Sequence, residues 1–235
     1  MTNAARRAFL IDVEGTTTPI AFVKDVLFPY ARSRLAAFAR VNADVPAVAA
    51  AIRDAAALAG DPTMTNGEAV QALLRWSDED RKATPLKSLQ GLIWRGGYES
   101  GEIAGQVFAD AAAALRDWKA RGIPTYVYSS GSVEAQKLLF RHSSQGDLLP
   151  TLAGHFDTTT GGKLEPQSYR AIADQVGVPT AAITFLSDHT GELIASRNAG
   201  MNAIRVKRAD EPTVSHEPWD GPVVASLAGL GAMAT

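Results

Sequence analysis

The sequence FLIDVEGTT at positions 9–17 decides how the rest of this chain is interpreted. Apolar residues lead directly into Asp12 and Glu14, and Gly15 and two threonines follow at once. A short buried strand that ends in a turn has this composition. An isolated carboxylate out of water is costly unless a cation or hydrogen bonds accompany it, and open α/β sheets bind ligands at the carboxyl ends of their strands. The stretch therefore predicts a metal site and a nucleophile at the end of a first strand.

Composition narrows the class of protein. The chain has 235 residues, of which 46% are hydrophobic and 20% charged, so one or two globular domains with a real core are expected. A net charge of -2 and the lack of a basic stripe argue against a nucleic-acid partner. The sequence has no cysteine, which excludes disulfides and thiolate chemistry and fits a reducing cytosol. With no apolar run as long as a signal peptide or membrane helix, a cytoplasmic protein without a membrane partner is predicted.

The chain is expected to have two structural parts. Helical periodicity without a convincing strand covers four segments, Phe22 to Phe38, Val45 to Leu58, Glu68 to Trp76 and Thr84 to Trp94. Pro29 should kink or divide the first, and the two glycines at 96–97 should end the last. Short strands then alternate with helices, which predicts an α/β fold with a parallel sheet covered by helices on both faces. The expected division is an α/β core of residues 1–19 and 106–235, with a helical insertion at 20–105.

Polar residues follow three apolar or turn segments in the second half. A strand ending at Tyr128 runs into Ser129 and Ser130, where hydroxyls and free amides at a helix start would bind an anion. The serines of the run 129–132, which ends in Ser132, could equally cap that helix. Lys163 follows two glycines and by itself suits a solvated loop, whereas Asp188 ends another apolar strand and could be a helix cap.

Taken together, these groups supply what phosphoryl transfer requires. Asp12 and Asp188 would hold a hard cation such as Mg²⁺, which prefers oxygen ligands. The carboxylate of Asp12 would attack phosphorus and form an aspartyl phosphate. Glu14 would protonate the leaving oxygen and later activate water.

The remaining groups of this set would neutralise charge on the phosphate. Ser129 or Ser130 would donate a hydrogen bond to it, and Lys163 would supply a positive charge. Glu192 lies four residues after Asp188. It could orient Asp188 or a metal-bound water, or it could simply be a favourable charge at a helix amino terminus.

The ordered set resembles the haloacid dehalogenase superfamily of aspartate-nucleophile phosphatases, whose first motif is Asp-x-Asp-Gly-Thr. This chain departs from the motif in having Glu14 at the second acid. With the surrounding residues, the departure resembles the enolase-phosphatase branch of methionine salvage. The matching stretches are residues 12–20, 22–30, 89–91, 93–94, 97–98, 128–140 and 185–188.

The resemblance implies two consecutive reactions on one polypeptide, with one Mg²⁺ per subunit and a monomeric enzyme. The first enolises 2,3-diketo-5-methylthiopentyl-1-phosphate, and the second releases phosphate to give the acireductone 1,2-dihydroxy-3-keto-5-methylthiopentene. The family's metal site falls on Asp12, Glu14 and Asp188, and its substrate site falls on Ser129, Ser130 and Lys163. For Glu14 the resemblance leaves three roles open. It could bind the metal through its backbone or its side chain, or serve as the base for enolisation.

Three competing functions are weighed against this one. Another phosphatase of the same superfamily would share the core residues and differ in the helical insertion, and the matches around Gly91 to Tyr98 argue against it. Dehalogenase chemistry needs no cation, so Glu14 and Asp188 would have no purpose. A phosphorylatable receiver module has its phospho-acceptor on an inner strand and lacks a long insertion.

Overall fold

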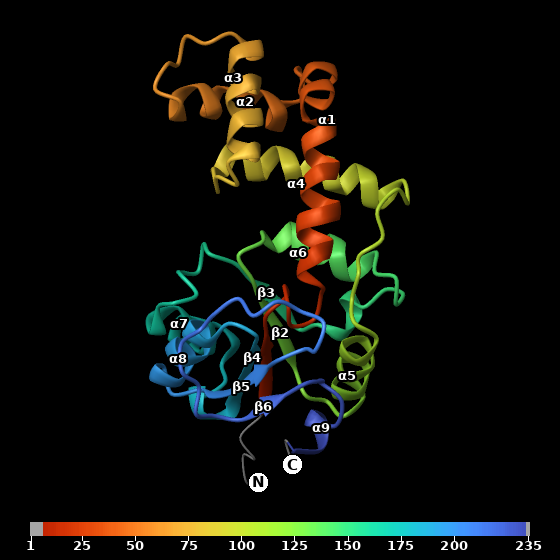
Figure 1. The fold of residues 1–235 in the computed structure, drawn as a ribbon, viewed down its shortest axis with the longest axis vertical. Coiled ribbons are helices and arrows are strands. Elements are labelled where there is room, and N and C mark those ends of the chain that lie inside the picture. The colour runs from red at the N-terminus through yellow and green to blue at the C-terminus, as the bar shows by residue number, and fades with distance from the viewer. Residues whose placement is uncertain (1–6, 234–235) are drawn as a thin grey trace. The chain divides into compact units, whose positions relative to one another are not determined.

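The computed structural model describes residues 7–233. The chain forms two compact units, and each is described by itself (Figure 1). The core unit consists of the residues up to Ile20 together with those from Ala104 onward, and the helical unit is Ala21–Ile103. The sequence placed the ends of the helical insertion at residues 20 and 105.

The core unit contains a parallel sheet. Among the described residues the sheet has six strands in the order β3-β2-β1-β4-β5-β6, and each neighbouring pair is parallel. The strands are β1 Ala8–Ile11, β2 Thr125–Tyr128, β3 Gly154–Phe156, β4 Ile183–Ser187, β5 Asn202–Val206 and β6 Val223–Val224. The predicted parallel α/β fold is confirmed. Strand β6 was not predicted, because two residues are too few to show alternation.

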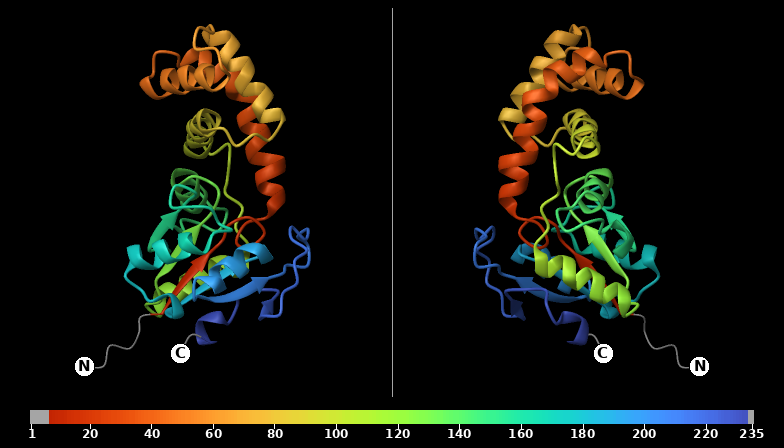
Figure 2. Two further views of the ribbon diagram at one scale, coloured as in Figure 1. Left: turned by 90° about the vertical axis from the view of Figure 1, so that its left-hand side faces the viewer. Right: turned by 90° about the vertical axis from the view of Figure 1, so that its right-hand side faces the viewer.

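Helices cover both faces of this sheet (Figure 2). They are α5 Ala109–Ala120, α6 Val133–Arg141, α7 Pro166–Val176, α8 Thr190–Asn198 and α9 Leu230–Met233. Successive residues of β1 point to opposite faces. Leu10 lies in a buried cluster with residues of α7 and α8, whereas Phe9 stacks on Trp118 of α5 with ring centroids 4.1 Å apart. Since both faces are covered, β1 is continuously apolar until Asp12.

The helical unit has a hydrophobic core of its own. Its elements are the π-helix η1 Phe22–Leu27 and the α-helices α1 Phe28–Val41, α2 Pro46–Leu58, α3 Asn66–Asp78 and α4 Thr84–Glu99. Pro29 lies in the first turn of α1, where its missing N–H is tolerated. The hydrogen-bond pattern changes from π to α at this point, so the predicted division at Pro29 takes the form of a change in helix type.

The prediction that Gly96 and Gly97 end a helix is wrong, because α4 continues to Glu99. A Cβ at Gly97 would lie 2.6 Å from the Tyr30 hydroxyl and 2.6 Å from a methyl carbon of Ile103. Gly97 is therefore required for close packing between α4 and α1. Sequence alone cannot distinguish a glycine that ends a helix from one that lets a neighbour approach.

No single helix among residues 7–233 is long and apolar enough to cross a membrane. The segments Phe22–Val41 and Pro46–Leu58 reach that length and composition only as a pair, bent by 109°. The buried helices of many globular proteins pass the same test, so this is weak evidence for a membrane segment.

Candidate active site

The loop after β1 is folded tightly around one backbone carbonyl. The Val13 carbonyl accepts hydrogen bonds from the backbone amides of Thr16, Thr17 and Thr18, at 3.2, 2.9 and 2.9 Å. Gly15 has a φ of +72°, and a Cβ there would lie 2.1 Å from Asp188 Oδ2. Glycine is therefore needed at position 15 both for its conformation and for the close approach of Asp188.

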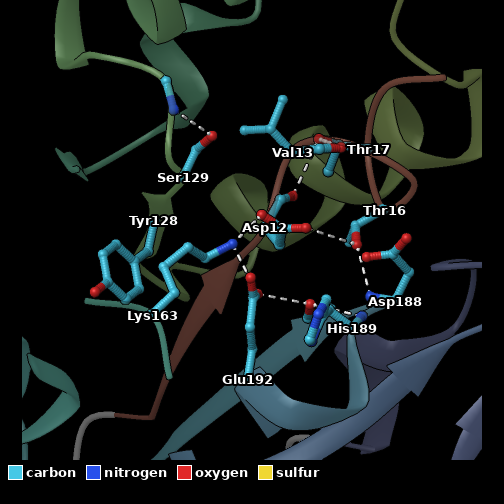
Figure 3. Close-up of polar contacts among 12 residues, drawn as sticks. Asp12, Val13, Thr16, Thr17, Tyr128, Ser129, Lys163, Asp188, His189 and Glu192 are labelled. Carbon is cyan, nitrogen blue, oxygen red and sulfur yellow. Dashed lines mark hydrogen bonds and ion pairs between the residues drawn. The ribbon is translucent and has the colours of Figure 1, made fainter. Parts of the chain in front are cut away.

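Lys163 lies between two buried carboxylates (Figure 3). Its Nζ is 2.5 Å from Asp12 Oδ1 and 2.7 Å from Glu192 Oε2. The side chains of Lys163, Asp12 and Glu192 are only 10%, 8% and 12% exposed. The alternative of a solvated loop lysine is therefore wrong. Tertiary structure brings Lys163 to Asp12 across 151 positions of sequence.

Thr16 connects Asp12 to Asp188. Its hydroxyl donates to Asp12 Oδ2 at 3.4 Å and accepts from the backbone amide of Asp188 at 3.1 Å. Helix α8 has His189 as its N-cap residue, with no side-chain capping bond. The alternative of Asp188 as a helix cap is therefore wrong, and the Asp188 carboxylate is available for another role.

Glu192 is a site residue whose partner the sequence did not reveal. It lies in the first turn of α8, as expected for a charge at a helix amino terminus. Its carboxylate also pairs with Lys163 and accepts a 3.0 Å hydrogen bond from the Ser187 hydroxyl. The sequence signal was its place four residues after Asp188, but nothing in the sequence linked it to the lysine.

The charges at this site do not balance. Three carboxylates, those of Asp12, Asp188 and Glu192, lie at this site, and the Lys163 ammonium pairs with those of Asp12 and Glu192. Burial, with repulsion from Asp12 and Glu192, raises the pKa of Asp188 to about 8. Burial also raises the pKa of Glu192 to about 7, although Lys163 opposes the shift. Burial alone would lower the pKa of Lys163, but its two carboxylate partners outweigh burial and raise it.

These residues fit a hard divalent cation. The raised pKa of Asp188 means that the folded protein gains by placing positive charge beside its carboxylate. Within residues 7–233 no group of three or more acidic, histidine or cysteine side chains is arranged as a complete metal site. Mg²⁺ does not require one, because it is commonly held by one or two carboxylates, waters and a substrate phosphate.

Ser129 follows β2 and is 4% exposed. Its hydroxyl oxygen accepts a 3.1 Å hydrogen bond from the Gly131 amide, so the hydroxyl proton remains able to donate to another group. The residue that caps α6 is Ser132, whose hydroxyl accepts from the Ala135 amide. The capping alternative is therefore confirmed for Ser132 and is wrong for Ser129 and Ser130. Ser130 is exposed.

Gln136 fixes the serine loop, residues 129–132 between β2 and α6. The sequence did not predict Gln136 as a site residue. Its Nε2 donates to the carbonyls of Gly131 and Phe156, both at 2.8 Å. Its Oε1 therefore faces His155 Nδ1 at 3.1 Å, and that nitrogen must carry the proton. Burial, assisted by Lys137, lowers the pKa of His155 to about 4 and keeps the ring neutral. A glutamine on an apolar helix face was the only sequence signal.

Glu14 lies in the same loop as Asp12. It is half-buried, and its backbone pairs with Thr18 in a one-residue bridge. The structure thus brings Asp12, Thr16, Lys163, Asp188 and Glu192 together through described contacts. Ser129 lies at the same carboxyl edge of the sheet (Figure 3).

An acid at the end of the first strand of a parallel α/β sheet, paired with a distant lysine, defines a class of hydrolase. The model of the haloacid dehalogenase-like hydrolase family matches residues 6–200, and the chain belongs to this family. Within it, the chain is 54% identical over 227 residues to the enolase-phosphatase E1 of Parvibaculum lavamentivorans. That match covers 96% of this chain and 95% of the relative.

Two further comparisons agree. The enolase-phosphatase E1 of Methylococcus capsulatus is 50% identical, over 90% of this chain and 93% of the relative. The crystal structure of the UTR4 protein from Saccharomyces cerevisiae has a TM-score of 0.78 and 31% identity, covering 94% of this chain and 98% of that one. The chain therefore belongs to the enolase-phosphatase E1 family.

Proposed function

We propose that this protein is a bifunctional, Mg²⁺-dependent enolase-phosphatase (acireductone synthase). It converts 2,3-diketo-5-methylthiopentyl-1-phosphate to 1,2-dihydroxy-3-keto-5-methylthiopentene and phosphate in methionine salvage. Membership of the enolase-phosphatase E1 family supports the reaction. The observation that carries the mechanism is the Asp12 carboxylate at the end of β1, held 2.5 Å from Lys163 Nζ.

In the phosphatase step, Asp12 is the nucleophile. The Lys163 ammonium pairs with one of its carboxylate oxygens, and the Thr16 hydroxyl donates to the other. Attack forms a bond from an Asp12 oxygen to phosphorus and breaks the bond from phosphorus to the substrate oxygen, which takes a proton from Glu14. Glu14 then removes a proton from a water that attacks the aspartyl phosphate, releasing phosphate and restoring Asp12.

The phosphate oxygens need positive charge and hydrogen-bond donors around them. Lys163 supplies the charge, and Ser129 donates its free hydroxyl proton with Ser130 beside it. The donors are already ordered before substrate arrives, because Gln136 fixes the serine loop and the two carboxylates fix the lysine. This preorganisation lowers the cost of reaching the transition state.

Asp12 and Asp188 would hold Mg²⁺ through their carboxylates and Glu14 through its backbone carbonyl, which leaves the Glu14 side chain for proton transfer. The bound ion would act as a Lewis acid that stabilises negative charge on the phosphate and on the enolate oxygen. In the enolisation step, we assign removal of the proton next to the carbonyl to the Glu14 carboxylate. Its side chain has one methylene more than the aspartate of the common motif and so reaches further into the site.

The wider setting of the enzyme belongs to the same proposal. The helical unit would be the cap domain of the phosphatase core, with a small phosphorylated diketone as the ligand. The composition and charge of the chain favour a cytoplasmic enzyme without nucleic-acid or membrane partners, and the family resemblance implies a monomer.

An ultraviolet time course with the diketo phosphate, recorded together with free phosphate, tests the proposal. The wild type should show a transient enol followed by phosphate, and EDTA should suppress both. Asp12→Asn should release no phosphate and accumulate the enol. Asp117→Asn, which alters an exposed ion pair on α5, is the matched control and should behave as wild type. Phosphate without an enol, or equal activity on unrelated phosphate esters, would show a general phosphatase instead.

A further inference from the structure

Residues 161–163 form the loop that carries Lys163, called here the lysine loop. Its three consecutive backbone carbonyls each accept a hydrogen bond from a different side-chain hydroxyl. Tyr128 donates to the Gly161 carbonyl at 2.9 Å. Ser168 donates to the Gly162 carbonyl at 2.8 Å, and Tyr169 donates to the Lys163 carbonyl at 2.7 Å. Every carbonyl of the Gly-Gly-Lys segment is thus held from the protein interior.

The three donors are themselves fixed in the core. Tyr128, Tyr169 and Ser168 are at most 1% exposed. The two tyrosine rings meet edge to face with centroids 5.5 Å apart, and Tyr169 packs in the same way on Phe185 at 5.2 Å. Burial raises the pKa of both phenols, so both remain protonated and able to donate. The hydroxyl positions are therefore set by the packing of β2, β4 and α7.

The lysine loop needs such support because its two glycines give the backbone wide conformational freedom. Two glycines precede Lys163, and Gly161 has a φ of +144°, where a Cβ would lie 2.2 Å from the Ser168 hydroxyl. Glycine loses more conformational freedom on ordering than any other residue. Without the three hydroxyls, the segment would sample many conformations, and the Lys163 ammonium would spend less time at Asp12.

We infer that Tyr128, Ser168 and Tyr169 are positioning residues that hold the backbone of Lys163 so that its ammonium stays on Asp12. The consequence for catalysis rests on the proposed function, in which Lys163 neutralises the phosphate. The three hydroxyls bond to backbone carbonyls of the loop rather than to the Asp12 carboxylate or the Lys163 ammonium. The Tyr128 ring also lies 5.8 Å from that ammonium, and phenylalanine keeps the ring. Placing a charged group within about 1 Å of its productive position can change a rate by up to about 100-fold.

The test removes single hydroxyl groups and follows the loop and the reaction separately. Tyr169→Phe and Tyr128→Phe each delete one oxygen and leave the ring in place. Amide hydrogen exchange of the full-length protein reports the loop through Glu165, whose amide donates to the Gly162 carbonyl at 3.1 Å. We expect protection of this amide to fall about tenfold in Tyr169→Phe, as one loop hydrogen bond is lost.

Steady-state phosphate release gives the second measurement. In Tyr169→Phe we expect kcat to fall about tenfold while KM changes less than about threefold, because the Lys163 ammonium acts mainly on the transition state. Tyr126→Phe is the matched control on β2, since its ring packs against Phe156, with centroids 6.1 Å apart. It should leave exchange at Glu165 and kcat unchanged.

Three results would overturn the inference. Unchanged exchange at Glu165 in both variants would show that the hydroxyls do not hold the loop. Faster exchange with kcat within about twofold of wild type would show that the loop does not position the lysine. Faster exchange throughout the sheet, with a lower Tm and kcat intact, would show a purely structural role. A wild type that releases no phosphate contradicts the proposed function instead, and the exchange measurement then decides the inference by itself.

Discussion

Replacing Lys163 by methionine removes a positive charge that lies between two buried carboxylates. Methionine has a side chain of similar length without the ammonium group, so the substitution isolates the effect of the charge. Asp12 and Glu192, 8% and 12% exposed, would then face each other without the ammonium that is now 2.5 and 2.7 Å away. Removing one partner of a buried ion pair typically costs about 3–5 kcal/mol. We expect a loss of this size in the free energy of unfolding at pH 8 in EDTA.

The loss should depend on pH in a defined direction. Lys163 lowers the pKa of Glu192, which is about 7 in the wild type because burial raises it, so the substitution raises that pKa further. A carboxyl whose folded pKa is raised binds more protons in the folded state than in the unfolded one. Stability then falls as pH rises from the unfolded value of about 4.5 through the folded value. The cost of the substitution should therefore be smaller at pH 5 than at pH 8.

Urea unfolding of wild type and variant at pH 5, 6.5 and 8 measures this. Arg121→Met is the matched control, because it breaks an ion pair of 2.8 Å in the same unit whose side chains are 47% and 46% exposed. An exposed pair contributes about 0.5 kcal/mol or less, with little pH dependence in this range. A cost of Lys163→Met below about 1 kcal/mol at pH 8, or one that shrinks as pH rises, would refute the buried-charge argument.

Three further predictions concern the metal, a close helix contact and the serine loop. In EDTA, the wild type should lose about 2–4 kcal/mol of its free energy of unfolding between pH 5 and 8, because the pKa of Asp188 is raised to about 8 and folding opposes its ionisation. Urea unfolding in saturating Mg²⁺ should show most of this pH dependence removed. A pH dependence unaffected by Mg²⁺ would contradict a metal at Asp188. Gly97→Ala should destabilise the protein by about 1–3 kcal/mol through overpacking. Gly96→Ala, with no atom within 4 Å of the added carbon, should stabilise it by up to about 1 kcal/mol. Equal effects of the two substitutions in thermal unfolding would exclude the packing role of Gly97. Gln136→Met should lower kcat for phosphate release about tenfold by freeing the Ser129 loop, and an unchanged kcat would show that the loop orders without it.

Much of the fold could be predicted because its signals are local. The buried strands are short apolar runs that end in polar residues, and the core helices show clear periodicity, so the α/β class and most elements follow from the sequence. The failures have local causes as well. Strand β6 is too short to leave a pattern, and Gly97 serves a contact with Tyr30 that only the packed helices reveal.

The candidate site was predicted as a set of residues, but their partners were not. Asp12, Lys163 and Asp188 could be chosen because each follows an apolar strand or a glycine turn, and parallel strands end at one edge of a sheet. The sequence could not decide between a cap and an anion donor for Ser129, since both need a hydroxyl before a helix. The structure excludes the cap for Ser129, because Ser132 caps the helix and the Ser129 hydroxyl accepts from the Gly131 amide. The role of anion donor stays a prediction.

By itself, the sequence determined the order of the elements, the acids at the strand ends and the family to which the chain belongs. These depend on side-chain type and spacing, which are properties of neighbouring residues. Only the tertiary structure decided that Lys163 pairs with Glu192 as well as Asp12, that Gln136 and His155 secure the serine loop, and that three hydroxyls hold the lysine backbone. The physical reason is that the energy of each contact depends on distance and burial, and both arise when segments far apart in sequence pack together.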